Sequence, residues 1–146
     1  MTVLPIVTGQ DTAVLRVENQ KVPQVTKEIK KLIKNMHDTV KKAEGLGIAA
    51  PQIGKSLKLC LANINGKMTP MMNPEITWKS EETSTMEEGC LSLPEIHVDV
   101  TRPVEISVSY QDKDGEVQER RLHDLDARVV QHEIDHLNGK LIVDYH

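Results

Sequence analysis

Apolar residues recur at helical spacing in one stretch near the N-terminus. The apolar stripe consists of Ile29, Leu32, Ile33, Met36 and Val40, and charged or polar residues fill the positions between them. This period predicts an amphipathic helix that packs one face on a core and turns the other to water. We expect Thr26 to be its N-cap and the helix to run to about Lys42, before the glycines at positions 45 and 47.

The middle of the chain has patterns typical of strands. Residues 57–64 are apolar, and Asn65-Gly66 after them is a signal for a two-residue hairpin. Apolar and polar residues alternate over 104–110, a turn is expected at 112–115, and a further strand is expected over 116–122. Prolines at positions 70, 74, 94 and 103 predict that the strands are short, with irregular connections.

A second helix is predicted from about Leu125 to Leu137, with Asp124 as N-cap and Asn138-Gly139 as its stop. Two neighbouring stripes are made of Leu125, Val129, His132 and His136, and of Val130, Ile134 and Leu137. Arg128, Gln131, Asp135 and Asn138 form a narrower polar face. A helix with so little polar surface is expected to be central and covered by strands. The pattern predicts an α+β fold, in which short, mainly antiparallel strands surround this helix and the amphipathic helix is N-terminal.

Length, composition and charge fit a single domain over residues 1–146 of a globular protein. Hydrophobic residues make up 38% and charged residues 27%. The net charge of −4 argues against a nucleic-acid surface or a polybasic membrane anchor. We expect no membrane span, since no apolar run approaches the roughly 20 residues required, and no secretory signal. Two cysteines are too few for a disulfide framework, so a reducing, cytoplasmic setting is expected.

His132-Glu133-Ile134-Asp135-His136 is an H-E-x-x-H sequence on the second predicted helix. Four residues make about one helical turn, so both imidazoles project the same way and can hold one metal ion. Glu133 lies about 100° around the helix, where it can reach water beside the metal without being a ligand. The alternative is a pair of core histidines bonded to backbone carbonyls, which the position of Glu133 disfavours. The sequence therefore predicts a metal hydrolase.

The third ligand is expected upstream of the helix. In the longer metzincin pattern the third histidine would fall at Ile142, and His146 comes four residues too late. A thermolysin-like glutamate on a further helix does not fit into the ten residues after His136. Cys90 is the leading candidate, because a thiolate and two imidazoles leave one tetrahedral position open. Cys60, inside an apolar strand, is better explained as a small buried hydrophobe.

Three segments resemble the signature motifs of peptide deformylases, in family order. They are Gly45-Leu46-Gly47-Ile48-Ala49-Ala50-Pro51-Gln52, Glu88-Gly89-Cys90-Leu91-Ser92 and Gln131-His132-Glu133-Ile134-Asp135-His136. The resemblance covers nearly the whole chain and is closest to a short form that lacks the usual C-terminal extension. It implies metal-dependent hydrolysis of the formyl group from the N-terminal formyl-methionine of nascent polypeptides, with release of formate.

The resemblance also assigns roles to residues. It implies that Cys90, His132 and His136 bind the metal and that Glu133 acts as general base and then general acid. It implies that the side-chain amide of Gln52 and the backbone N–H of Leu91 stabilise the oxyanion. Without the resemblance, Gln52 would be an ordinary turn residue after a proline.

The resemblance further implies a substrate cleft with a pocket for the methionine side chain. The residues expected to form the cleft are Leu46, Gly47, Gly89, Leu125 and Val129. His97 is expected near the cleft, where many relatives have an arginine, and an imidazole would hold the peptide backbone more weakly.

The metal, the partners and the rival functions follow from the same residues. A His₂Cys set suits Zn²⁺ and also accepts Fe²⁺, Ni²⁺ or Co²⁺, and the resemblance implies one divalent ion, natively Fe²⁺. The expected substrate is a formyl-methionyl peptide, met at the ribosome by a monomer in the cytoplasm, in a phage host's cytoplasm or in an organelle. The alternatives are a metallopeptidase or amidase acting on another substrate, and a metal-binding module without enzymatic activity.

Overall fold

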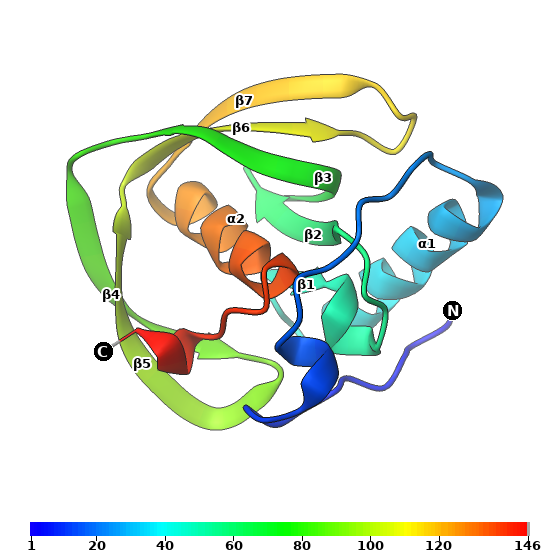
Figure 1. Cartoon of the computed structure of the whole chain (residues 1–146), viewed down its shortest axis with the longest axis horizontal. Helices are drawn as coiled ribbons and strands as arrows, with labels where there is room; N and C mark the ends of the chain where they lie inside the picture. The colour runs from blue at the N-terminus through cyan, green and yellow to red at the C-terminus, as the bar shows by residue number, and fades with distance from the viewer. Residues whose placement is uncertain (146) are drawn as a thin grey trace.

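The computed structural model describes residues 1–145 and has an α+β architecture (Figure 1). A five-stranded antiparallel sheet has the order β1-β2-β3-β6-β7, and β4 and β5 form a separate antiparallel pair. The strands are β1 (Gly47–Ala49), β2 (Leu59–Ile64), β3 (Lys67–Lys79), β4 (Thr83–Cys90), β5 (Leu93–Pro103), β6 (Glu105–Gln111) and β7 (Val117–His123). The helices are α1 (Lys27–Lys42) and α2 (Asp124–Leu137), with 3-10 turns η1 (Ala13–Leu15), η2 (Ala50–Ile53) and η3 (Ile142–Asp144). The predicted fold class is confirmed.

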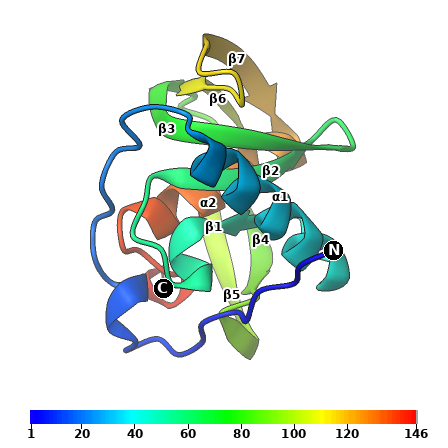
Figure 2. The ribbon, with the colours of Figure 1, turned by 90° about the vertical axis from the view of Figure 1, so that its right-hand side faces the viewer.

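Helix α1 has the predicted limits. The hydroxyl oxygen of Thr26 accepts a hydrogen bond of 3.2 Å from the Ile29 N–H, which caps the first turn. Met36 and Val40 are fully buried in a cluster with Leu59 and Leu61 of β2. The amphipathic stripe therefore packs on one face of the five-stranded sheet, as Figure 2 shows for α1 beside β2.

Strand β2 is apolar on both faces because helices cover both. Side chains alternate along a strand, so Leu59 and Leu61 face the α1 cluster while Cys60, Ala62 and Ile64 join the cluster under α2. The predicted hairpin after it is confirmed: Asn65 and Gly66 have φ of 55° and 78° and connect β2 to β3.

The prediction of short strands around the prolines is wrong. Strand β3 has 13 residues and contains two prolines, and β5 has 11 residues. Pro70 pairs with Leu61 of β2, but β6 pairs with β3 only from Met72 onward. The side of β3 away from β2 therefore forms no strand–strand hydrogen bonds at Pro70, and the missing N–H of proline is tolerated there. Pro74 falls where the register shifts between Met72 and Glu75, and a bulge needs no regular ladder bond there.

Helix α2 crosses the interior between the five-stranded sheet and the β4–β5 pair (Figure 1). Its N-cap is His123 rather than the predicted Asp124, whose N–H donates to the Val104 carbonyl at 2.8 Å. The predicted stop is confirmed, with Asn138 as C-cap and Gly139 at φ 75°. A Cβ at Gly139 would lie 2.7 Å from the carbonyl of Arg16, so only glycine fits.

The predicted polar face of α2 is open to water only toward its C-terminal end, where Asp135 is partly exposed and Asn138 is exposed. Arg128 and Gln131 are only 5% and 6% exposed. Both are buried because the β4–β5 pair covers this side of the helix and supplies hydrogen-bond partners, Val100 and Ser84 for Arg128 and Pro103 for Gln131. No helix within residues 1–145 is both long and apolar enough to span a membrane.

Candidate metal centre

His132 and His136 lie one turn apart on α2, with ring centroids 5.0 Å apart. Cys90, the last residue of β4, lies opposite them, and its Sγ is 3.3 Å from Nε2 of His136. One ligand atom from each of the three residues lies within 4.8 Å of the others. The structure therefore brings together the three residues expected to bind the metal, while His146 lies outside the described residues.

The end of β4 supplies both a thiol and a carboxylate to α2. Residues two apart in a strand share a face, so Glu88 and Cys90 both turn toward the helix. The Glu88 carboxylate accepts a hydrogen bond of 2.9 Å from Nδ1 of His132. This bond leaves Nε2 of His132 available to the cluster and orients the ring.

Glu88 is itself held by two buried arginines. Arg102 donates to both carboxylate oxygens, at 2.7 and 2.9 Å, and Arg128 donates to one of them. Burial alone would raise the pKa of Glu88, but the hydrogen bonds from Arg102 and His132 hold it well below its usual range. Glu88 is therefore a fixed negative charge behind His132.

The two histidines and the thiol fit a divalent cation. Burial opposes a charge on His132, yet hydrogen bonds to Cys90 and Glu88 raise its pKa to about 10. Groups that stabilise a proton at this point also attract a metal ion, which would displace that proton on binding. Burial lowers the pKa of His136 well below 6.5, so this ring is neutral, as a metal ligand must be.

Glu133 lies beside the cluster without belonging to it, and it faces β1. Its side chain is only 4% exposed, and Oε1 has no hydrogen-bond partner within residues 1–145. Burial raises the pKa of Glu133 to about 7, near the pH at which a general base works best. A Cβ at Gly47 would lie 2.5 Å from Oε2 of Glu133 and 2.8 Å from the Leu61 carbonyl, so glycine makes room for the carboxylate.

Gln52, in the turn η2, is buried with its amide in a fixed orientation. Its Oε1 accepts from the Ala49 N–H at 2.9 Å, and its Nε2 donates to the Ser92 hydroxyl at 3.1 Å. Nε2 also lies 3.8 Å from Sγ of Cys90. The amide N–H₂ therefore points toward the cluster, and Leu91, next to Cys90, lines the same pocket.

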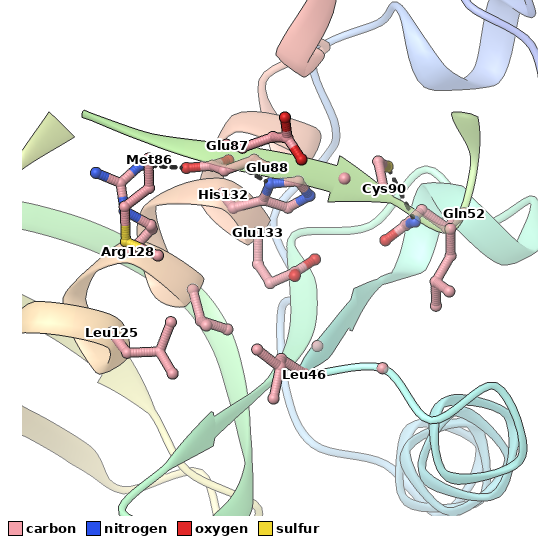
Figure 3. A pocket seen from close by; sticks show the side chains of 15 residues that line it. Leu46, Gln52, Met86, Glu87, Glu88, Cys90, Leu125, Arg128, His132 and Glu133 are labelled. Atoms are coloured by element: carbon pink, nitrogen blue, oxygen red, sulfur yellow. Dashed lines mark hydrogen bonds and ion pairs between the residues drawn. The ribbon is translucent and has the colours of Figure 1, made fainter. Parts of the chain in front are cut away.

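A pocket of about 400 Å³ opens in front of the cluster. Figure 3 shows Leu46 and Leu125 on one side of it and Glu88, His132 and Cys90 on the other. All five predicted cleft residues, Leu46, Gly47, Gly89, Leu125 and Val129, line this pocket, together with Met86 and Arg128.

The structure does not bring His97 into the pocket lining. His97 pairs with Gly89 across the β4–β5 ladder, and its exposed imidazole lies against the glycine, 3.3 Å from where a Cβ would be. His97 therefore lies near the pocket, on the strand next to Gly89, and its role toward the substrate stays a prediction.

Several residues of the site were not predicted to take part in it. They are Glu88, Arg102 and Arg128, which hold His132, and Ser92, which holds Gln52. Glu88 and Ser92 flank Cys90 within the second motif, and this proximity is the signal that could have identified them. Arg102 and Arg128 carry no such signal, because only the fold places them beside Glu88.

Comparisons with known proteins agree with this geometry. The family model described as polypeptide deformylase matches residues 3–146. A peptide deformylase of Synechocystis sp. is 44% identical over 136 residues, covering 90% of this chain and 73% of the relative. One from Pseudothermotoga lettingae is 46% identical over 131 residues, covering 90% and 76%.

Solved structures of peptide deformylases superpose closely on the chain. The enzyme of Ehrlichia chaffeensis in complex with actinonin has a TM-score of 0.96 at 35% identity, covering 100% of this chain and 90% of the other. The Thermotoga maritima enzyme has a TM-score of 0.95 at 40% identity, covering 99% and 98%. The Acinetobacter baumannii enzyme bound to Met-Ala-Ser has a TM-score of 0.94 at 32% identity, covering 99% of both. The chain therefore belongs to the polypeptide deformylase family.

Proposed function

We propose that this chain removes the formyl group from the N-terminal formyl-methionine of polypeptides and releases formate. The observation that carries the proposal is the Cys90–His132–His136 cluster with the buried Glu133 beside it, at one wall of a pocket in a member of the deformylase family. No observation favours a peptidase or an amidase acting on another substrate.

Cys90, His132 and His136 are the proposed metal ligands. When bound, a divalent ion supplies Lewis acidity and lowers the pKa of water to near neutral. Thiolate and imidazole donors accept Fe²⁺, Zn²⁺, Ni²⁺ and Co²⁺. Fe²⁺ is the proposed native ion because of the resemblance to deformylases, and the other three are proposed substitutes. Glu88 would support any of them by keeping His132 oriented.

Glu133 is the proposed proton carrier. With a pKa of about 7, it can accept a proton from the attacking water and then deliver it to the leaving amine. Its carboxylate has no protein partner for Oε1 within the described residues, so this oxygen is available to water or substrate.

Gln52 and Leu91 are the proposed oxyanion donors. The amide of Gln52 is already oriented by Ala49 and Ser92, so it needs no reorganisation when charge develops on the formyl oxygen. The backbone N–H of Leu91 would donate from the same side of the pocket as Cys90.

The pocket suits a peptide that begins with methionine. Apolar side chains of Leu125 and Val129 line the side away from Cys90, where a methionine side chain would be buried. Gly47 and Gly89 line the same pocket and would face the bound peptide with their backbone groups. The related Acinetobacter baumannii enzyme has a solved structure with bound Met-Ala-Ser, which supports a peptide that begins with methionine as the ligand.

We further propose that residues 1–146 act as one domain and as a monomer. Formyl-methionine begins nascent chains, so the enzyme would meet its substrate at the ribosome, in the cytoplasm or in an organelle that makes protein.

The test is a comparison of formylated and unformylated Met-Ala-Ser with the chain loaded with Ni²⁺ or Fe²⁺. We expect release of formate from the first peptide and no cleavage of the second. Cleavage of the unformylated peptide without formate release from the other would overturn the proposal and select a peptidase.

A further inference from the structure

The segment after α2 folds back against the β4–β5 pair. Leu141 and Ile142 are buried in a cluster with Leu93 and Val100 of β5. This anchoring carries the turn η3 and then Tyr145 to the side of α2, close to β4 and β5 (Figure 1).

Tyr145 contacts the same arginine that holds Glu88. Its hydroxyl donates to Oδ2 of Asp135 at 2.6 Å, and Nη1 of Arg102 donates to that oxygen at 2.8 Å and to the Tyr145 hydroxyl at 3.2 Å. The Arg102 Cζ lies 4.9 Å from the centroid of the Tyr145 ring. Burial and the bond to Asp135 raise the pKa of Tyr145, so the phenol stays a donor.

The opposite edge of the Arg102 guanidinium faces Glu88, which is hydrogen-bonded to the metal centre. Its Nε and Nη2 donate to the two oxygens of Glu88, and Glu88 accepts from Nδ1 of His132. A guanidinium is planar and rigid, so a tilt at its Nη1 end moves its Nε edge as well. An unbroken series of contacts therefore joins Tyr145 to His132 through Arg102 and Glu88.

We propose that Tyr145 is a positioning residue for the metal centre, acting through Arg102 and Glu88 on the orientation of His132. The inference rests on the proposed metal site. The phenol oxygen is the part of Tyr145 that matters for this role, because Leu141 and Ile142 already hold the segment in place by apolar burial.

The test is the rate at which bound Zn²⁺ passes from Tyr145→Phe to a colorimetric chelator. The matched control is Tyr110→Phe, since Tyr110 is the only other tyrosine and lies in the sheet core away from these contacts. Loss of a direct outer partner of a metal ligand costs about 10–100-fold in affinity. Tyr145 lies two contacts beyond that partner, Glu88, so we expect the smaller effect that Tyr145→Phe releases the metal about 3–10-fold faster. The Tm of the chelator-treated variant should match that of the wild type.

A double-mutant cycle separates this path from a general loosening of the segment. In an Arg102→Lys background, the further change Tyr145→Phe should leave the release rate unchanged, because the guanidinium that joins Tyr145 to Glu88 is already absent. An unchanged rate in Tyr145→Phe alone, or a full additional effect in the Arg102→Lys background, overturns the inference. A wild-type chain that retains no metal refutes the site and the inference together, whereas a chain that holds metal and lacks activity refutes only the proposed reaction.

Discussion

Gly47 and Glu133 meet at a crowded point between β1 and α2. The glycine lacks the atom that would collide with the carboxylate, and burial keeps the carboxylate partly protonated near neutral pH. A strand residue without a side chain thus allows an ionisable group to lie in the interior beside the metal cluster.

Substituting Gly47 by alanine should damage both catalysis and stability. The new Cβ would displace Glu133, and a displacement of about 1 Å in a reacting group costs about 100-fold in rate. The Leu61 carbonyl, 2.8 Å from the same Cβ, is backbone and cannot rotate away, so the unfolding free energy should fall as well. Deformylation kinetics and urea unfolding measure the two effects. Wild-type kcat/KM in Gly47→Ala would contradict the assigned role of this contact.

Glu133 should also make stability depend on pH. Burial raises its pKa to about 7 in the folded chain, against about 4.3 for a solvated glutamate, so the folded state binds the proton more tightly. The unfolding free energy of the wild type therefore falls as pH rises through about 4.3 to 7, by up to ~4 kcal/mol. The side chain of Glu133→Gln stays neutral, so the unfolding free energy of this variant should rise relative to that of the wild type over this pH range. Urea unfolding of both chelator-treated chains at about pH 4 and about pH 8 measures this difference in unfolding free energy. The same difference at both pH values would disprove the assigned pKa shift of Glu133.

At the residue scale, local spacing predicted much of the candidate site. Two histidines four apart on a helix and the search for a third donor led to Cys90, and the structure gathers all three. Spacing could not identify Arg102, whose partners Glu88 and Asp135 are 14 and 33 residues away along the chain. Ion pairs of this kind depend on tertiary structure and leave no pattern in the sequence.

The last residues of β4 contact the other elements of the site. Glu88 faces α2 beside Cys90 and forms ion pairs with Arg102 and Arg128, while Glu87, one residue earlier, is exposed. The alternation of the strand therefore separates a structural carboxylate from a solvated one.

Glu88→Gln should destabilise the chain and weaken metal binding. Removing the charge takes the carboxylate partner from Arg128 and leaves Arg102 paired with Asp135 alone among the described residues, and breaking a buried ion pair typically costs about 3–5 kcal/mol. His132 loses its charged acceptor, and loss of such a partner costs about 10–100-fold in metal affinity. The matched control is Glu87→Gln, which should change neither quantity. Urea unfolding and metal competition are the measurements. Equal behaviour of the two variants would show that Glu88 does not hold the site together.

At the element scale, two features set by local chemistry were predicted correctly, whereas the N-cap of α2 and features set by neighbouring strands were not. The cap of α1 by Thr26 and the Asn65-Gly66 hairpin need only adjacent residues, and both are confirmed. The length of β3 was underestimated because a proline is tolerated wherever one side of the strand is unpaired, and pairing is a property of the sheet.

Three hydrophobic clusters support the part of the chain that the structure describes, and they consist of apolar side chains and include neither histidine of the metal centre. One lies between the sheet and α2, one under α1, and one between β5, the N-terminal segment and the residues after α2. The buried members of these clusters are hydrophobic side chains, and Cys90, one of the metal-binding candidates, packs against the third cluster. The fold therefore does not depend on the metal for its core.

Metal removal should leave the chain folded. We expect an unchanged far-UV circular dichroism spectrum after chelation and a lower Tm, because a ligand that binds only the folded state adds about 2.7 kcal/mol at a free concentration 100 times its Kd. Thermal unfolding with and without added Zn²⁺ measures this. Unfolding by the chelator alone would show that the clusters are insufficient.

The most direct test of the account is formate release from formyl-Met-Ala-Ser by metal-loaded wild type and Glu133→Gln, with metal content determined on the same samples. Glu87→Gln, which changes an exposed carboxylate at the edge of the same pocket, is the control for altered charge. We expect full metal content in all three chains, and a loss of about 10²–10⁴-fold in turnover only in Glu133→Gln. Near wild-type turnover by a fully loaded Glu133→Gln would contradict it.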